Sequence, residues 1–216
     1  MIDESVVREN LQRIRERIAS AGGTNVKVVA VTKSLPASAW TVASAVGCDA
    51  IGENYAQEIT SKSVAMANHV PVHFIGQLQS NKVRHLTGLV DVWQTVDRES
   101  LLREIVKRAE GLDSPRIFVQ VNTTNELNKG GCEPREARRL VELARSLGCR
   151  VDGAMTVGPT SADVKETREA FAVLRAVADD LGLVERSMGM TGDLEIAVEE
   201  GSTMVRIGTA LFGQRP

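Results

Sequence analysis

The chain has 216 residues and a formal net charge of −2, and 43% of its residues are hydrophobic. This length suits one large α/β domain or two small ones, and it is ample for a core. The near-neutral charge gives no general attraction to nucleic acid or to an anionic membrane. No apolar run approaches the roughly 20 residues of a membrane-spanning helix. The N-terminus also lacks the pattern of a secretory signal, so we expect a cytoplasmic protein.

The sequence predicts one helix followed by eight strands that alternate with helices. In chain order we expect helices over residues 3–20, 39–46, 55–67, 81–86, 98–109, 134–147, 163–181 and 193–200, and strands over residues 26–31, 49–54, 72–76, 90–96, 116–121, 151–157, 186–190 and 203–208. Such alternation implies parallel strands with helical crossovers. Eight units match a closed (β/α)₈ TIM barrel, and a doubly wound open sheet stays the alternative. No linker interrupts the pattern, so we expect one domain over residues 1–216.

The cysteines and histidines give little indication of a metal site or of a disulfide. Cys48, Cys132 and Cys149 are far apart and form no CxxC pair, so neither a disulfide framework nor a zinc site is indicated. The three histidines do not stand at metal-ligand spacing with acids. We expect His73, inside a predicted strand, to be a hydrogen-bonded core residue. The glycine-rich loop that precedes Cys132 is predicted to be a solvated turn, with a mobile lid as the alternative.

Lys33 follows the first β-branched strand at its C-terminal tip. In both candidate architectures the chemistry gathers at the C-terminal ends of the strands. Burial of the ammonium at such a tip would lower its pKa and favour a nucleophilic amine. The alternative is a lysine that marks the strand end and extends its head into water.

Two further features lie at the end of the last strand. Arg206 stands inside an apolar run, where an unpaired guanidinium would be costly, so it needs a carboxylate, an anion or a ring nitrogen as partner. A structural ion pair is a serious alternative. Gly208 and Thr209 can offer backbone N–H groups and a hydroxyl to a phosphate, with Ser187 and Thr191 nearby in the preceding loop. The alternative is that Gly208 and Gly213 are present only because the chain turns at these positions.

Five stretches together resemble one known family. They are VAVTK (29–33), IGENYAQE (51–58), HFIGQLQSNK (73–82), SMGM (187–190) and GSTMVRIGTALFG (201–213). In this order and along the whole chain they are similar to the pyridoxal-5′-phosphate (PLP) homeostasis proteins. These are single-domain relatives of the alanine racemase N-terminal barrel.

The resemblance implies a fold-type III PLP site. Lys33 would form a Schiff base with the cofactor aldehyde, and Arg206 would meet the pyridine nitrogen. An arginine there disfavours a protonated ring nitrogen and so weakens PLP as an electron sink. The remaining implied contacts are Asn54 and Met190 at the ring, and Ser187, Gly208 and Thr209 at the phosphate.

The resemblance also implies limits on catalysis. Racemase relatives add a C-terminal β domain with an opposing tyrosine base, whereas this chain stops at Pro216 and has Tyr55 as its one tyrosine. A two-base racemase needs an acid or base on each face of its substrate. We therefore expect a monomeric, non-catalytic PLP carrier in vitamin B6 homeostasis, which exchanges PLP with PLP-dependent apoenzymes. A racemase-like PLP enzyme is the alternative, followed by a sugar-phosphate barrel enzyme with a Schiff-base lysine and no PLP.

Overall fold

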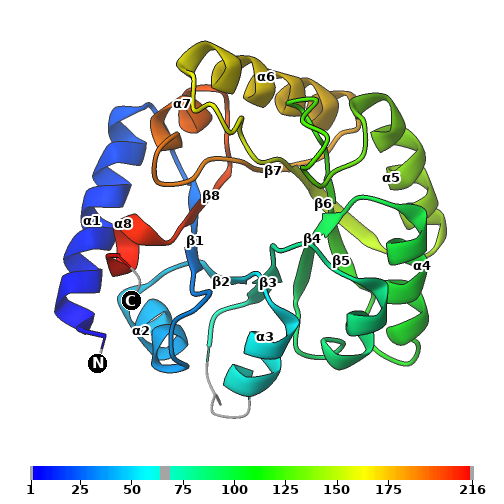
Figure 1. Cartoon of the computed structure of the whole chain (residues 1–216), viewed down its shortest axis with the longest axis horizontal. Helices are drawn as coiled ribbons and strands as arrows, with labels where there is room; N and C mark the ends of the chain where they lie inside the picture. The colour runs from blue at the N-terminus through cyan, green and yellow to red at the C-terminus, as the bar shows by residue number, and fades with distance from the viewer. Residues whose placement is uncertain (1, 64–68, 215–216) are drawn as a thin grey trace.

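The computed structural model describes residues 2–63 and 69–214, and in it eight parallel strands close into a barrel inside a ring of helices (Figure 1). The predicted TIM barrel is therefore confirmed, and the open sheet is excluded because the first strand pairs with the last. The strands are β1 (Lys27–Val31), β2 (Ala50–Glu53), β3 (Val72–Phe74), β4 (Val92–Val96), β5 (Arg116–Gln120), β6 (Arg150–Met155), β7 (Glu185–Ser187) and β8 (Met204–Ile207).

The helices follow the predicted order with small shifts at their ends. The helices are α1 (Glu4–Ser20), α2 (Ser38–Val46), α3 (Ala56–Ser63), η1 (Ser80–His85), α4 (Glu99–Arg108), η2 (Pro134–Glu136), α5 (Ala137–Ser146), α6 (Val164–Asp180), α7 (Leu194–Glu199) and α8 (Thr209–Phe212). Both η elements are 3₁₀-helices. The prediction for residues 64–67 lies outside the described residues. The short helix α8 was not predicted.

The helix α1 closes the outer wall of the barrel. Asp3 caps it, since its carboxylate accepts a hydrogen bond from Ser5 N at 2.9 Å. Its apolar stripe is fully buried, and α1 lies beside α8 (Figure 1), where Asn10 Nδ2 donates to Leu211 O at 3.0 Å. The first and last helices are thus joined over the seam between β1 and β8.

The hydrophobic core is divided into two layers by the strands. The larger layer fills the space between strands and helices. The smaller one fills the barrel interior and consists of Val29, Ala50, Val92, Phe118, Met155 and Met204. Because side chains alternate across a strand, Val31, two positions after Val29, faces the same way. β1 ends at Val31, and Lys33 stands in the turn that follows it at the C-terminal mouth.

The pairing of β1 with β8 determines where Arg206 and Lys33 lie along the barrel axis. Val29 lies opposite Arg206 in the parallel ladder, and facing residues of neighbouring strands point to the same side. Lys33 follows two residues after the end of β1, in a turn. It therefore stands beyond the level of Arg206, on the side of the C-terminal mouth.

The strand β7 ends at Ser187, three residues earlier than predicted. Gly189 adopts φ +96°, a left-handed conformation that favours glycine, so the extended backbone stops there. An added Cβ at Gly189 would also lie 2.5 Å from Cβ of Ala197. Met188 and Gly189 still lie beside β8, since Met188 N donates to Met204 O at 3.1 Å and Gly189 O accepts from Arg206 N at 2.9 Å.

Candidate functional site

Lys33 lies at the C-terminal mouth of the barrel and is half-buried. Within the described part of the chain, its amine takes part in no hydrogen bond or ion pair. The preceding Thr32 and the following Ser34 are both held by side chains from other elements. The structure thus presents an amine without a protein partner on a fixed backbone, which is the arrangement that a ligand-binding lysine requires.

Arg206 is buried in the barrel interior, with 4% of its surface exposed. Nη1 donates to Ser187 O at 2.7 Å and to Ser187 Oγ at 2.8 Å, and Nη2 donates to Thr156 O at 2.7 Å. No carboxylate among the described residues forms an ion pair with it, so the predicted structural ion pair is not the explanation for its place. Burial lowers the pKa of Arg206 to about 10, and the guanidinium remains a cation at neutral pH.

A chain of polar groups extends from Arg206 across the barrel interior. Ser187 Oγ donates to Gln94 Oε1 at 2.7 Å, and Gln94 Nε2 lies 2.6 Å from His73 Nδ1. Burial, followed by the charges of Arg116 and Lys27, lowers the pKa of His73 to about 3. The imidazole is therefore neutral and accepts the amide hydrogen, which agrees with the predicted core histidine.

Ser187 is placed differently from the other expected phosphate contacts. It is fully buried, and its hydroxyl donates to Gln94 while it accepts from Arg206. A hydroxyl engaged in this way holds the guanidinium in place. Its assignment to the phosphate stays a prediction, and this geometry does not favour it.

Gly208, Thr209 and Met190 meet at the end of β8. Gly208 precedes α8, Thr209 opens it with an exposed side chain, and Met190 is 41% exposed. Thr191 joins this group, since its Oγ1 accepts a hydrogen bond from Ala210 N at 3.3 Å. The N–H groups of residues 210–212 already have acceptors. An anion at this corner would therefore be bound by the N–H groups of Gly208 and Thr209 and by the Thr209 hydroxyl.

Asn54 follows β2 on the far side of β1. Its Oδ1 is buried and accepts no hydrogen bond from the described residues. The backbone here is tightly packed, because a Cβ at Gly76 would lie 2.1 Å from Asn54 O. A buried acceptor without a partner costs about 1–3 kcal/mol, so Asn54 is suited to a ligand that brings a donor.

A cavity of about 420 Å³ adjoins Asn54 at the mouth. Its wall includes Tyr55, Gln77, Lys82 and Arg98 as well as Asn54, and is mainly polar in residue type. The Arg98 guanidinium is engaged with Asp97 at 2.7 Å and with Leu78 O at 2.7 Å. This part of the mouth therefore has room for a ligand beside Asn54.

The loop that precedes Cys132 is tied to the neighbouring loop after β6. Lys129 Nζ donates to Gly158 O and to Glu126 at 2.8 Å, and Glu126 accepts from Thr160 Oγ1 at 2.6 Å. The bond from Lys129, helped by those from Thr160, lowers the pKa of Glu126 to about 2. These contacts make the loop a tethered turn at the edge of the mouth.

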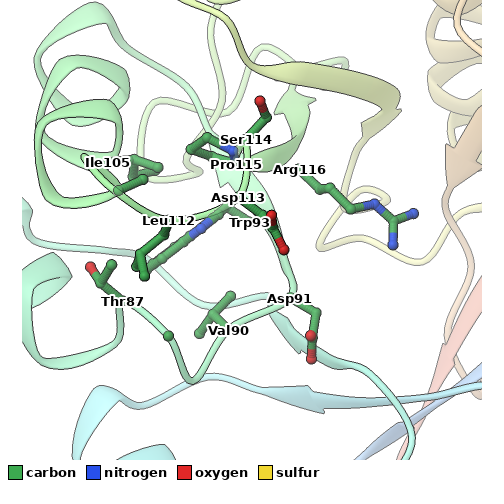
Figure 2. Close-up of a pocket in the computed structure, with 12 residues that line it drawn as sticks. Thr87, Val90, Asp91, Trp93, Ile105, Leu112, Asp113, Ser114, Pro115 and Arg116 are labelled. Atoms are coloured by element: carbon green, nitrogen blue, oxygen red, sulfur yellow. The ribbon is translucent and has the colours of Figure 1, made fainter.

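A further cavity, of about 310 Å³, lies at the opposite end of the barrel (Figure 2). Its walls come from the residues before β4 and β5, among them Asp91, Asp113 and Arg116, together with Trp93 and Leu112. None of the predicted site residues lines it. Asn54 lines the cavity at the mouth, and Lys33, Gly208 and Thr209 follow the C-terminal ends of β1 and β8, so the mouth is the candidate site.

Sequence reasoning missed several residues that shape this site. Gln94 and Thr156 hold the Ser187–Arg206 unit. Alternation within β4 could have indicated that Gln94 points inward. Two residues of the helix after β2, Glu58 and Lys62, bond the backbone beside Lys33. The helical pattern alone gave no signal for this contact.

The fold and the lysine–arginine pair define the class of the alanine racemase N-terminal barrel, and the family model "Alanine racemase, N-terminal domain" matches residues 2–216. A pyridoxal phosphate homeostasis protein of Pseudomonas aeruginosa is 39% identical, over 98% of this chain and 96% of the relative. One from Aquifex aeolicus is 37% identical, over 96% and 97%. The chain therefore belongs to the family of pyridoxal phosphate homeostasis proteins, as the motifs predicted.

Solved structures agree with this assignment. PipY of Synechococcus elongatus with PLP bound is 32% identical, has a TM-score of 0.85, and matches 96% of this chain and 100% of its own. An alanine racemase from Streptomyces lavendulae, at 20% identity, has a TM-score of 0.80 over 100% of this chain and 58% of its own. The racemase shares the fold. Across residues 2–63 and 69–214, no helix has the length and apolar character to cross a membrane.

Proposed function

We propose that this protein binds PLP at the barrel mouth, with Lys33 as the covalent attachment point, and that it serves PLP homeostasis. The observation that supports the proposal is that β1 and β8 are neighbours, so that Lys33, just past the end of β1, stands at the mouth of the barrel whose interior holds Arg206. The printed names of the relatives and the PLP-bound neighbour support it. When bound, PLP would supply an aldehyde carbon that a lysine amine can attack with loss of water.

The residues present fit this cofactor. Lys33 has an amine without a protein partner in the described structure, and Asn54 Oδ1 is a buried acceptor in need of a donor. Gly208, Thr209 and Thr191 would hold the phosphate at the start of α8. Met190 would cover the ring with its half-exposed side chain.

Arg206 would meet the ring nitrogen. The three bonds from its Nη atoms to Ser187 and Thr156 fix the guanidinium, and its Nε takes part in none of them. A fixed cation next to the ring nitrogen disfavours a second positive charge there. Arg206 thus keeps the bound cofactor a weak electron sink, which supports a carrier without efficient catalysis.

The partners and location belong to the same proposal. Exchange of PLP with PLP-dependent apoenzymes, a monomeric state and a cytoplasmic location stay predictions. The alternative is a racemase-like enzyme that uses the same site. Transfer of PLP from the loaded protein to an apoenzyme, faster than by release into solution, would be the direct evidence for a carrier.

Absorbance spectroscopy with borohydride trapping tests the proposal. The purified protein with added PLP should show the band of lysine-bound PLP, and peptide mass spectrometry after reduction should place the label on Lys33. Lys33→Ala should lose the band and keep its fold, whereas Lys165→Ala, with its exposed side chain, should behave as wild type. A protein that stays colourless with added PLP would contradict the proposal. Rapid exchange of the alanine α-hydrogen in deuterated water would favour the racemase-like alternative.

A further inference from the structure

Both peptide groups that flank the Cα of Lys33 are tied to one helix. Thr32 O accepts a hydrogen bond from Lys62 Nζ at 2.8 Å, and Ser34 N donates to the two carboxylate oxygens of Glu58 at 3.0 and 2.9 Å. Glu58 and Lys62 stand one turn apart on α3 and bond each other at 2.6 Å. A single ion pair therefore holds the backbone immediately before and after Lys33.

Lys62 is committed to this network. Its side chain is 6% exposed, and its third hydrogen bond goes to Glu53 Oε1 at 2.7 Å. That oxygen also accepts from Thr32 Oγ1 at 2.6 Å and Trp40 Nε1 at 2.9 Å. An ammonium has three donors, so Lys62 has none left for a ligand. Its role is confined to the residues around it.

Ser34 adopts a conformation that needs such support. Its φ is +61°, in the left-handed region that a residue with a Cβ seldom occupies. The bonds from Ser34 N to Glu58 compensate for this conformation. The turn reverses the chain directly after Lys33, so the direction of the Lys33 side chain depends on it.

We propose that Lys62 and Glu58 are positioning residues for Lys33: they fix the two peptide planes at its Cα so that the amine enters the mouth, and the uptake of PLP by Lys33 depends on them. This inference rests on the proposed function. Without the network the backbone samples other directions, and the amine spends less time in reach of the aldehyde carbon. Misplacement by about 1 Å can slow a reaction by up to about 100-fold.

The experiment compares Lys62→Met and Glu58→Ala with Thr60→Ala, a control on the same helix whose hydroxyl bonds only its own turn. The first measurement is the rate of PLP uptake on Lys33. The second is the affinity for pyridoxine 5′-phosphate, which has an alcohol in place of the aldehyde. The third is hydrogen exchange of the Ser34 amide in the ligand-free protein.

We expect uptake of PLP to slow by about 10- to 100-fold in both variants, with wild-type affinity for pyridoxine 5′-phosphate and faster exchange at Ser34. The control should match wild type in all three measurements. Unchanged uptake overturns the proposal, and so does an equal loss of both ligands, because that result would mean a collapsed site. Glu58→Ala keeps the Glu53–Lys62 pair and decides the question if Lys62→Met does not fold.

The result for the wild-type protein distinguishes a failure of the positioning role from a failure of the proposed function on which it rests. A wild-type protein that takes up no PLP overturns the proposed function and, with it, the role of Lys62 in uptake. Ser34 exchange in the ligand-free variants would then still report whether the ion pair holds the backbone. Uptake by wild type together with unchanged uptake in the variants overturns the positioning role alone.

Discussion

The guanidinium of Arg206 donates to both the backbone carbonyl and the hydroxyl of Ser187, at 2.7 and 2.8 Å. This double contact makes Ser187 a part of the arginine's support, in the barrel interior and below the mouth. The Ser187 hydroxyl in turn donates its hydrogen to Gln94 Oε1. Arg206 is therefore held by neutral oxygens, and its positive charge stays uncompensated by any ion pair among the described residues.

The two hydroxyls of the seventh loop can be separated by mutation. We expect Thr191→Val, which keeps the side-chain shape, to weaken PLP binding by about 10- to 100-fold, since one hydrogen bond to a charged group contributes about 1.5–3 kcal/mol. Ser187→Ala should leave the affinity for pyridoxine 5′-phosphate close to wild type. Titration calorimetry with that ligand measures both. The reverse ranking would assign the phosphate to Ser187.

Ser187→Ala should instead reduce the stability of the fold. It removes the acceptor of one Arg206 bond and leaves Gln94 Oε1 without its donor in the barrel interior. We expect the free energy of unfolding to fall by about 1–3 kcal/mol, as measured by urea denaturation of the ligand-free protein. Ser100→Ala, on the exposed side of α4, serves as control. A stability equal to wild type would mean that the buried chain of hydrogen bonds contributes nothing.

Periodicity in the sequence was enough to predict the eight strands and their order. The apolar runs and the helices between them indicated a barrel, and Arg206 was recognised from its apolar neighbours. The ends of elements were less certain, because they depend on single dihedral angles. Gly189 ends β7 through its positive φ, and a strand pattern does not contain that information.

Contacts between distant residues explain what the sequence could not predict. Ser187 ends β7 and bonds Gln94 and Arg206 in the interior, whereas Thr191 lies four residues later and bonds Ala210 of α8. The bonds from Glu58 and Lys62 to the backbone beside Lys33 join residues 24 and 30 positions apart. Such pairs arise because α3 follows β2 and packs beside the end of the neighbouring β1, so a pattern along one helix could not indicate them.

The three cysteines should react slowly in the native protein. Burial raises the pKa of Cys48 and Cys132 to about 12 and that of Cys149 to about 11. Since the thiolate is the reactive form, thiol-specific labelling with Ellman's reagent at pH 8 should wait for unfolding. Leu127→Cys places a thiol at a fully exposed position and should react at once. Fast labelling of Cys132 alone would instead indicate a reactive thiol in its loop.

His73 should make the protein less stable in mild acid. Burial lowers its pKa to about 3 in the folded state, whereas the unfolded chain takes up the proton near pH 6.5. Between these values the unfolded state binds more protons, so the free energy of unfolding falls as the pH falls, by at most about 1.4 kcal/mol per pH unit. Above pH 6.5 this contribution to stability is fully present.

The variant His73→Gln isolates that contribution, because a glutamine oxygen can still accept from Gln94 and does not titrate. Urea denaturation at intervals from pH 7.5 to 4 should show a gap between wild type and the variant that shifts in favour of the variant below pH 6.5. His85→Gln, at an exposed position, should follow wild type throughout. A gap that is constant with pH would show that His73 titrates in the folded protein as it does in the unfolded chain, and would contradict its place in a desolvated barrel interior.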